Sequence, residues 1–184
     1  MIRRVAALLL GAVLLVACTH PVAPSAGGSA GSPLPPRPRE LGVDELDLCS
    51  VLDAAAREAL GVSRGEYGPA NQVVGDFCRW SHYPSEPVES YYVVRERDLD
   101  AATGLLAPRG ATMEVIAGFG AVVTQGQYDD PNTGCLILID AAKGKTLKVS
   151  YGYNGSTVPM TRDIACGKAR KAAELVLGAI LARG

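Results

Sequence analysis

Histidine is scarce in this 184-residue chain, which limits the chemistry that its side chains can perform. There are two histidines, His20 and His82, and His20 lies in a stretch dominated by proline, glycine and serine. A Ser-His-Asp triad would have to use His82, and zinc catalysis needs several nitrogen, sulfur or carboxylate ligands around an open position. Neither the number nor the spacing of such residues suits these sites, so we expect no catalytic residue, metal or cofactor.

The chain also lacks a long apolar run and a strong charge of either sign. Its N-terminal apolar segment, residues 5–16, is too short to cross a membrane, which takes a helix of about 20 residues. Eighteen basic and 19 acidic side chains give a formal net charge of -1, without a basic cluster. We therefore expect no membrane-spanning helix and no nucleic acid partner.

Motifs for phosphate binding are incomplete. Gly144-Lys145-Thr146 has the end of a P-loop, but Ile139 occupies the position of the required first glycine. Gly118-Phe119-Gly120 lacks the third glycine of a dinucleotide-binding loop. We interpret both as turns. The acidic cluster at residues 129–132 also favours a turn over a calcium site, because it lacks the glycine and distal glutamate of an EF-hand.

The N-terminus has the organisation of a bacterial lipoprotein signal. Arg3 and Arg4 precede the apolar segment, which ends in Leu15-Val16-Ala17-Cys18. A positive region, an apolar core and a small residue before the cleavage point are typical of a secretory signal. We predict that residues 1–17 are removed and that Cys18 carries palmitate-type acyl chains on its sulfur. The alternative is an ordinary cleaved signal peptide that contains a cysteine by chance.

A tether follows the predicted lipid attachment point. Residues 18–40 contain six prolines among glycines and serines, without apolar periodicity. Such a segment buries too little surface to offset the entropy lost on ordering, so we predict that it is disordered. Residues 41–184 then form a single globular domain, which the lipid on Cys18 would hold at the extracytoplasmic side of the cell membrane.

Four cysteines lie in the predicted domain: Cys49, Cys78, Cys135 and Cys166. An even number of cysteines in an exported domain favours two disulfides. The alternative, a metal site with four thiolates, lacks any pair of cysteines two residues apart. Four thiols allow three connectivities, and the sequence pattern alone does not choose among them.

The pattern of the domain predicts an α+β fold. Asp53 is a suitable N-cap and Gly61 a suitable C′ residue for a helix over 54–60. Strands are predicted over 77–81, 90–95, 112–116, 121–125, 135–139 and 146–153, with a modest helix over 99–106. A stripe of apolar residues at helical spacing predicts a terminal helix over 163–182. The hairpin-like links favour an antiparallel sheet with helices packed on one face.

Aromatic residues on the predicted strands are candidates for a binding surface. Trp80, Tyr91 and Tyr151 lie on predicted strands, and on an exposed face they would form a platform for a glycan, peptide or lipid. The alternative, which we favour, is that they pack across strands in the core.

Several short motifs lie along the predicted mature chain: Asp47-x-Cys49-Ser50-Val51-Leu52, Cys78-x-Trp80, Gly118-x-Gly120 and Cys166 at the start of an Ala-rich helix. With the lipobox and the tether, they resemble a family of actinobacterial lipoproteins that share a domain of unknown function. The resemblance implies a location in the cell envelope and sequential bridges, Cys49 to Cys78 and Cys135 to Cys166. It implies no activity.

The sequence therefore predicts a lipid-anchored envelope domain that is not an enzyme and binds a small ligand or a partner protein. A cell-envelope hydrolase is the alternative from another class, and it would need His82 or a pair of carboxylates in a pocket. An accessory subunit of a wall or secretion complex is a third interpretation, which differs from the first only in its partner.

Overall fold

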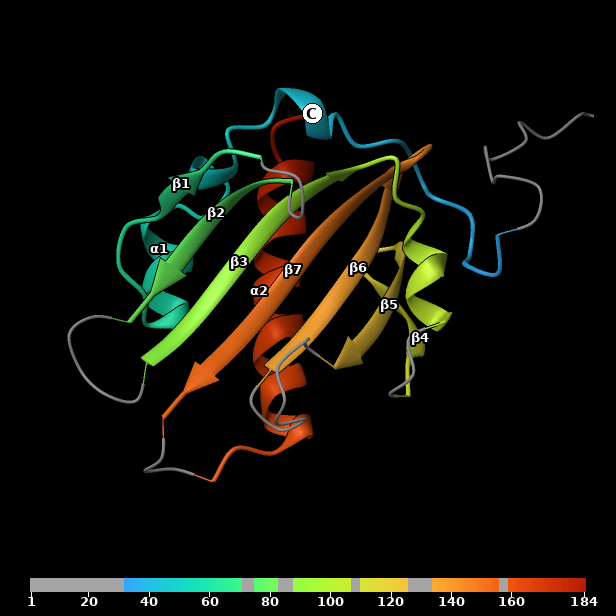
Figure 1. Ribbon diagram of the computed structural model, residues 1–184. Coiled ribbons are helices and arrows are strands. Elements are labelled where there is room, and N and C mark those ends of the chain that lie inside the picture. The colour runs from blue at the N-terminus through green and yellow to red at the C-terminus, as the bar shows by residue number, and fades with distance from the viewer. Residues whose placement is uncertain (1–31, 71–74, 83–87, 107–109, 126–133, 156–158) are drawn as a thin grey trace, which may run out of the picture.

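A seven-stranded antiparallel sheet forms the centre of the molecule (Figure 1). The computed structural model describes residues 32–70, 75–82, 88–106, 110–125, 134–155 and 159–184. The sheet order is β1-β2-β3-β7-β6-β5-β4, and every neighbouring pair is antiparallel. The strands are β1 (Glu66–Gly68), β2 (Asp76–Ser81), β3 (Val88–Arg97), β4 (Thr112–Ile116), β5 (Phe119–Gln125), β6 (Gly134–Ala142) and β7 (Lys145–Asn154). The predicted α+β class with an antiparallel sheet is confirmed.

A long C-terminal helix covers one face of this sheet. Helix α2 (Arg162–Leu181) runs nearly vertically behind the diagonal strands in Figure 1, and Thr161 caps its first turn by accepting from the Ile164 amide. Its buried stripe includes Ala165, Ala169, Ala172, Ala173, Val176 and Ile180, all predicted from the sequence. Small alanine side chains let the helix backbone approach the sheet closely. The main core therefore fills the space between α2 and the strands.

Short helical segments complete this layer. They are η1 (Val43–Glu45), η2 (Leu48–Ser50) and α1 (Ala54–Leu60). The predicted caps of α1 are confirmed: the Asp53 carboxylate accepts from the Ala56 amide at 2.8 Å, and Gly61 adopts a left-handed φ of 68°. Gly61 is suited to this conformation because it has no Cβ.

Two disulfides connect the helical layer to the sheet. Cys49 in η2 is bonded to Cys78 in β2, and Cys135 in β6 is bonded to Cys166 in α2. The bonded cysteines are 29 and 31 residues apart in sequence. Loops of this length reduce the entropy of the unfolded chain enough to stabilise the fold by roughly 3–4 kcal/mol each in the chain-entropy model. The connectivity that the family resemblance implies is confirmed.

The second face of the sheet is partly covered as well. The 3-10 helix η3 (Ala101–Leu106) packs over β5 and β6, where Ala101 and Leu34 form a small cluster with Val122 and Leu138. Arg37 is also buried, and its guanidinium lies 2.6 Å from Asp140 in β6. The composition placed these residues in the disordered tether, with the domain beginning at residue 41. That boundary is too late, because the apolar side chain of Leu34 and the ion pair of Arg37 hold this segment on the sheet.

Candidate functional site

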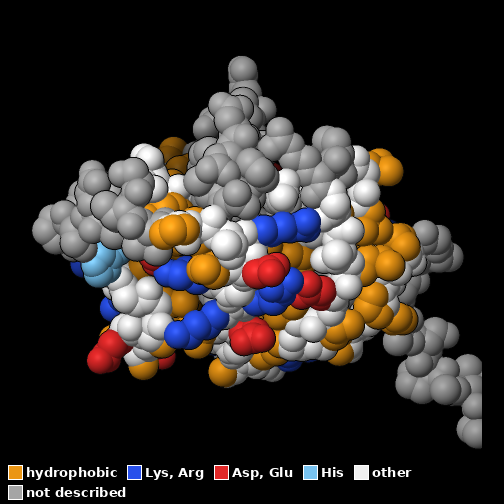
Figure 2. Space-filling view, turned by 90° about the horizontal axis from the view of Figure 1, so that it is seen from below, with side chains coloured by type: hydrophobic (Ala, Val, Ile, Leu, Met, Phe, Trp, Pro, Cys, Tyr) orange, Lys and Arg blue, Asp and Glu red, His pale blue; other side chains and the backbone are white. Residues whose placement is uncertain are grey.

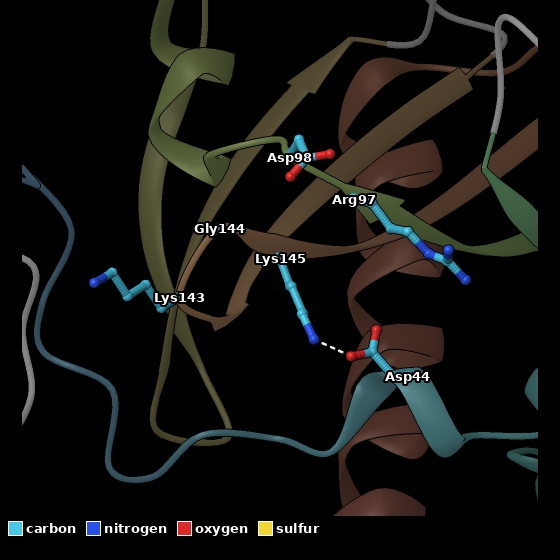
Figure 3. Close-up of a pocket in the computed structure, with 6 residues that line it drawn as sticks. All are labelled: Asp44, Arg97, Asp98, Lys143, Gly144 and Lys145. Carbon is cyan, nitrogen blue, oxygen red and sulfur yellow. Dashed lines mark hydrogen bonds and ion pairs between the residues drawn. The ribbon is translucent and has the colours of Figure 1, made fainter.

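A polar cavity of about 360 Å³ opens at one end of the sheet (Figure 3). Three segments that are distant in sequence form it: η1, the end of β3 and the turn between β6 and β7. The volume is within the range of small-ligand sites, roughly 300–1,000 Å³, but such sites are usually lined by apolar side chains. Here the lining consists of Asp44, Arg97, Asp98, Lys143, Gly144 and Lys145.

Two left-handed residues shape the cavity. Gly144 has a φ of 68° in the β6–β7 turn, and Asp98 has a φ of 59° directly after β3. The Asp98 amide donates to the Gly144 carbonyl at 3.0 Å, which fixes the two segments side by side. A positive φ is uncommon outside glycine, although aspartate tolerates it better than most residues. The prediction that Gly144-Lys145-Thr146 belongs to a hairpin turn is confirmed.

Charged side chains surround the cavity. Lys145 forms an ion pair with Asp44 across it, and this contact is the main reason that the pKa of Asp44 lies below its usual value. Lys143 and Arg97 extend on opposite sides of this pair in Figure 3. The Arg97 side chain is 67% exposed and lies 3.7 Å from Asp76. Three cations against the two carboxylates of Asp44 and Asp98 leave the cavity with a net charge of +1.

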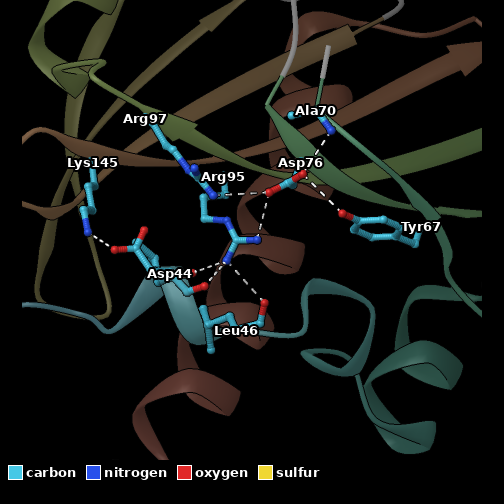
Figure 4. A network of polar contacts seen from close by, with 9 residues as sticks. Asp44, Leu46, Tyr67, Ala70, Asp76, Arg95, Arg97 and Lys145 are labelled. Carbon is cyan, nitrogen blue, oxygen red and sulfur yellow. Dashed lines mark hydrogen bonds and ion pairs between the residues drawn. The ribbon is translucent and has the colours of Figure 1, made fainter.

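A buried arginine holds the floor of this region in place (Figure 4). Arg95 in β3 donates to the carbonyl oxygens of Val43 and Asp44 at 2.8 and 2.6 Å. Its other terminal nitrogen donates to Asp76 in β2 at 3.0 Å. Arg95 therefore joins η1 to two strands, and this contact fixes the position of Asp44 at the cavity.

Asp76 is the acidic partner at the centre of the network. Its carboxylate also accepts from the Ala70 amide at 3.0 Å and from the Tyr67 hydroxyl at 3.2 Å. The Ala70 hydrogen bond, followed by the one from Arg95, lowers the pKa of Asp76. Asp76 therefore stays ionised to a lower pH than an ordinary aspartate, so the network remains charged.

The predicted aromatic surface lies elsewhere and is not exposed. Trp80, Tyr91 and Tyr151 are cross-strand neighbours in β2, β3 and β7, so they do share one face of the sheet. That face is the one that α2 covers, and all three side chains are buried. The Tyr91 and Tyr151 rings pack 5.2 Å apart, and burial raises the pKa of both hydroxyls. Core packing, the alternative that we favoured, explains these residues.

The other residues considered for catalysis, metal binding or lipid attachment are not among those that line the cavity. The Nδ1 of His82 lies 2.5 Å from the Gly61 carbonyl oxygen at the opposite end of β2 from Asp76. Within the described ranges, no group of three or more histidine, cysteine, aspartate or glutamate side chains is arranged to hold a metal ion. Cys18 and the acidic cluster at 129–132 lie outside the described residues.

Sequence reasoning missed the cavity because its residues come from three separate segments. Their individual signals are ordinary: a glycine in a hairpin turn, lysines beside it and charges at the end of a strand. A sequence pattern would have suggested their proximity only if the partner of β3 had been known. In the sheet, β3 pairs with β7 over ten residues, which brings Arg97 opposite Lys145.

A family model for a protein of unknown function, DUF3558, matches residues 13–179. The chain belongs to the DUF3558 family. The match begins at residue 13, within the apolar N-terminal segment, and includes both disulfides and most of α2, so the domain of unknown function that the motifs resemble is confirmed at the level of the family.

The other comparisons give no further information about the function of this DUF3558 protein. No curated protein matches the chain. Among solved structures, a crystal structure of Ara h 8.0201 matches with 10% sequence identity and a TM-score of 0.30, covering 73% of this chain and 85% of that one. Similarity this low carries no argument about function. No helix in the described part of the chain is long and apolar enough to cross a membrane.

Proposed function

We propose that this DUF3558 protein is a lipid-anchored, extracytoplasmic domain that binds a ligand or partner and catalyses no reaction. The lipobox ending at Cys18 is the observation that carries the proposal. The two disulfides support it, because such bonds persist in oxidising compartments outside the cytoplasm. Two or more acyl chains on one cysteine bind a bilayer stably, whereas a single chain holds only marginally.

Fractionation of cells tests the anchor. The unsubstituted protein should sediment with membranes and dissolve only in detergent. A Cys18→Ser variant should appear in the soluble fraction or keep an uncleaved leader, while a Ser29→Ala variant in the tether should behave as the unsubstituted protein. Equal membrane retention of a leader-free Cys18→Ser variant would contradict the proposal.

The polar cavity is the binding site that we propose. Lys143 and Arg97 leave cationic groups on either side of the Asp44–Lys145 ion pair, and Arg97 is largely exposed. A carboxylate or phosphate group could accept hydrogen bonds from these cations without displacing a buried contact. The ligand class is therefore a small anion, or an anionic group carried by a larger molecule.

Nuclear magnetic resonance tests this site with inorganic phosphate and acetate as probes. The Gly144 amide signal should shift in a saturable way, and Arg97→Gln or Lys143→Gln should weaken the apparent affinity several-fold. Arg64→Gln, which removes an exposed arginine from the loop after α1, is the matched control and should leave it unchanged. Shifts spread evenly over the surface, or equal losses in all three variants, would exclude the cavity as an anion site.

A further inference from the structure

Exposed apolar side chains gather at the β4 end of the sheet. Five large hydrophobic residues are exposed in the described part of the chain, and four belong to β4 or to the elements beside it: Leu106 (85%), Met113 (53%), Val115 (62%) and Ile164 (46%). Helix η3, which ends at Leu106, packs over Val122, the cross-strand neighbour of Met113. Figure 2 shows hydrophobic side chains along the right-hand flank, the side on which β4 lies in Figure 1.

Strand β4 is also an open edge. It pairs with β5 over its five residues, and among the residues that the structure describes no further strand follows it in the sheet order. Alternate residues of an antiparallel strand direct their backbone groups away from the partner strand, so about half of the N–H and C=O groups of β4 face outward. Such an edge is a template for another strand.

The two edges of the sheet differ in their protection. Strand β1 has three residues and is followed at once by Pro69, which cannot donate a hydrogen bond. Strand β4 contains no proline and no lysine. Its single charge, Glu114, is bound by two nitrogens of Arg170 in α2 at 2.6 and 2.7 Å, on the face that α2 covers. Because Arg170 neutralises this carboxylate, its charge does not prevent another strand from pairing with β4.

We propose that β4 pairs in an antiparallel manner with β4 of a second copy of this chain, around a two-fold axis at Glu114. In this register Met113 lies opposite Val115 of the second copy, and Val115 opposite its Met113. The two apolar pairs would lie on the outer face of a sheet that runs through both copies. Leu106 of each copy belongs to η3, which packs on the same face as these pairs, whereas Ile164 belongs to α2 on the opposite face.

The charges on the face that α2 covers also favour a second copy of this chain as the partner of β4. The axis would bring the two Glu114 carboxylates together, but each is already paired with an Arg170 guanidinium. Two carboxylates and two guanidinium groups then form a neutral cluster, in which each arginine can contact either glutamate. A strand of five residues buries less than the roughly 800 Å² per partner of a standard stable interface. The dimer should therefore be reversible and should form more readily as the protein is concentrated.

Cysteine crosslinking of the full chain in membranes tests this proposal. A Glu114→Cys substitution places one thiol on the axis, where paired strands bring Cα atoms to about 4.5–5.5 Å, within the range that a disulfide spans. A mild oxidant should then produce a covalent dimer that a reductant dissociates. Glu66→Cys is the matched control, because Glu66 is also an edge-strand glutamate paired with an arginine, but it lies on β1.

Adding Val115→Lys to Glu114→Cys should reduce the dimer at least tenfold. Equal dimer from the Glu66 and Glu114 variants, or none from a Glu114→Cys protein that keeps both native disulfides, would overturn the proposal. The unsubstituted chain in detergent gives an independent measurement. Hydrogen exchange at residues 112–116 should slow as the ratio of protein to detergent rises, while exchange in β1 stays constant. Exchange in β4 that is independent of this ratio would also overturn it.

Discussion

Gly65 allows the protein to pack its single tryptophan against a disulfide. A Cβ atom at this position would lie 2.5 Å from Cys78 Sγ and 2.7 Å from Trp80 Nε1. Non-bonded heavy atoms normally approach to about 3.5–4.0 Å, so a methyl group would have to displace both neighbours by about 1 Å. Both neighbours are fully buried, and one is covalently linked to Cys49. The clash therefore cannot be relieved by a flexible side chain.

We expect Gly65→Ala to lower the free energy of unfolding by about 2–3 kcal/mol, the upper part of the range for overpacked cores. For a domain of this size, the melting temperature should fall by roughly 5–10 °C. The matched control is Gly178→Ala in α2, where a Cβ would meet nothing within 4 Å. Replacing a helical glycine at an open position should stabilise the fold by about 0.5–1 kcal/mol.

Denaturant unfolding followed by circular dichroism gives both free energies. Fluorescence of Trp80, the only tryptophan in the chain, reports the change at the site itself. A Gly65→Ala protein as stable as the unsubstituted one would refute the close packing of Gly65, Trp80 and the Cys49–Cys78 disulfide. So would equal effects of the two glycine substitutions.

Three further predictions concern the polar network and the N-terminal segment. Arg95→Met should lower the free energy of unfolding by about 3 kcal/mol, because it leaves the mostly buried Asp76 carboxylate without its nearest cation. Arg97→Met, at an exposed position, should lower it by less than about 1 kcal/mol. Similar losses from the two variants would contradict the structural role of Arg95. The pKa of Asp76 is lowered in the folded state, so its contribution to stability is present above the unfolded pKa of about 4 and is lost as the pH falls through the lower folded value. Titrated unfolding free energies of Asp76→Asn should therefore decline less on acidification than those of the unsubstituted protein, and parallel curves would argue against this role. Leu34→Ala should lower the free energy of unfolding in denaturant by about 2–3 kcal/mol, and substitution of the exposed Pro36 by alanine should leave it almost unchanged. An unchanged stability of Leu34→Ala would mean that this segment belongs to the disordered tether and not to the domain.

Local signals in the sequence predicted most elements because short-range chemistry determines them. Asp53 and Gly61 predicted both ends of α1, and the alanine stripe predicted the buried face of α2. Strand β4 has the predicted bounds. Strand β1 was missed, because its three residues include a glycine and carry no alternating pattern. It forms because β2 offers an edge on which Glu66 pairs with Arg79.

Features that depend on long-range pairing were less accessible from the sequence. Period-two alternation along a strand over residues 77–81 implies that Cys78 and Trp80 lie on one face, but it does not say which face a helix will cover. That choice follows from the position of α2, so the residues between the buried aromatics, such as Arg79 and Tyr92, are the ones on the opposite face. The cavity depends likewise on the β3–β7 pairing, and the inclusion of Leu34 depends on its contact with η3. No local pattern encodes these contacts.

Intact mass spectrometry of protein extracted from its native membrane tests the central claim most directly. We expect the mass of residues 18–184 plus a diacylglyceryl group, with or without a third acyl chain on the new α-amine. The Cys18→Ser variant should carry no lipid. An unmodified Cys18 on the mature protein, or the same lipid on the Cys18→Ser variant, would contradict a lipid-anchored DUF3558 protein.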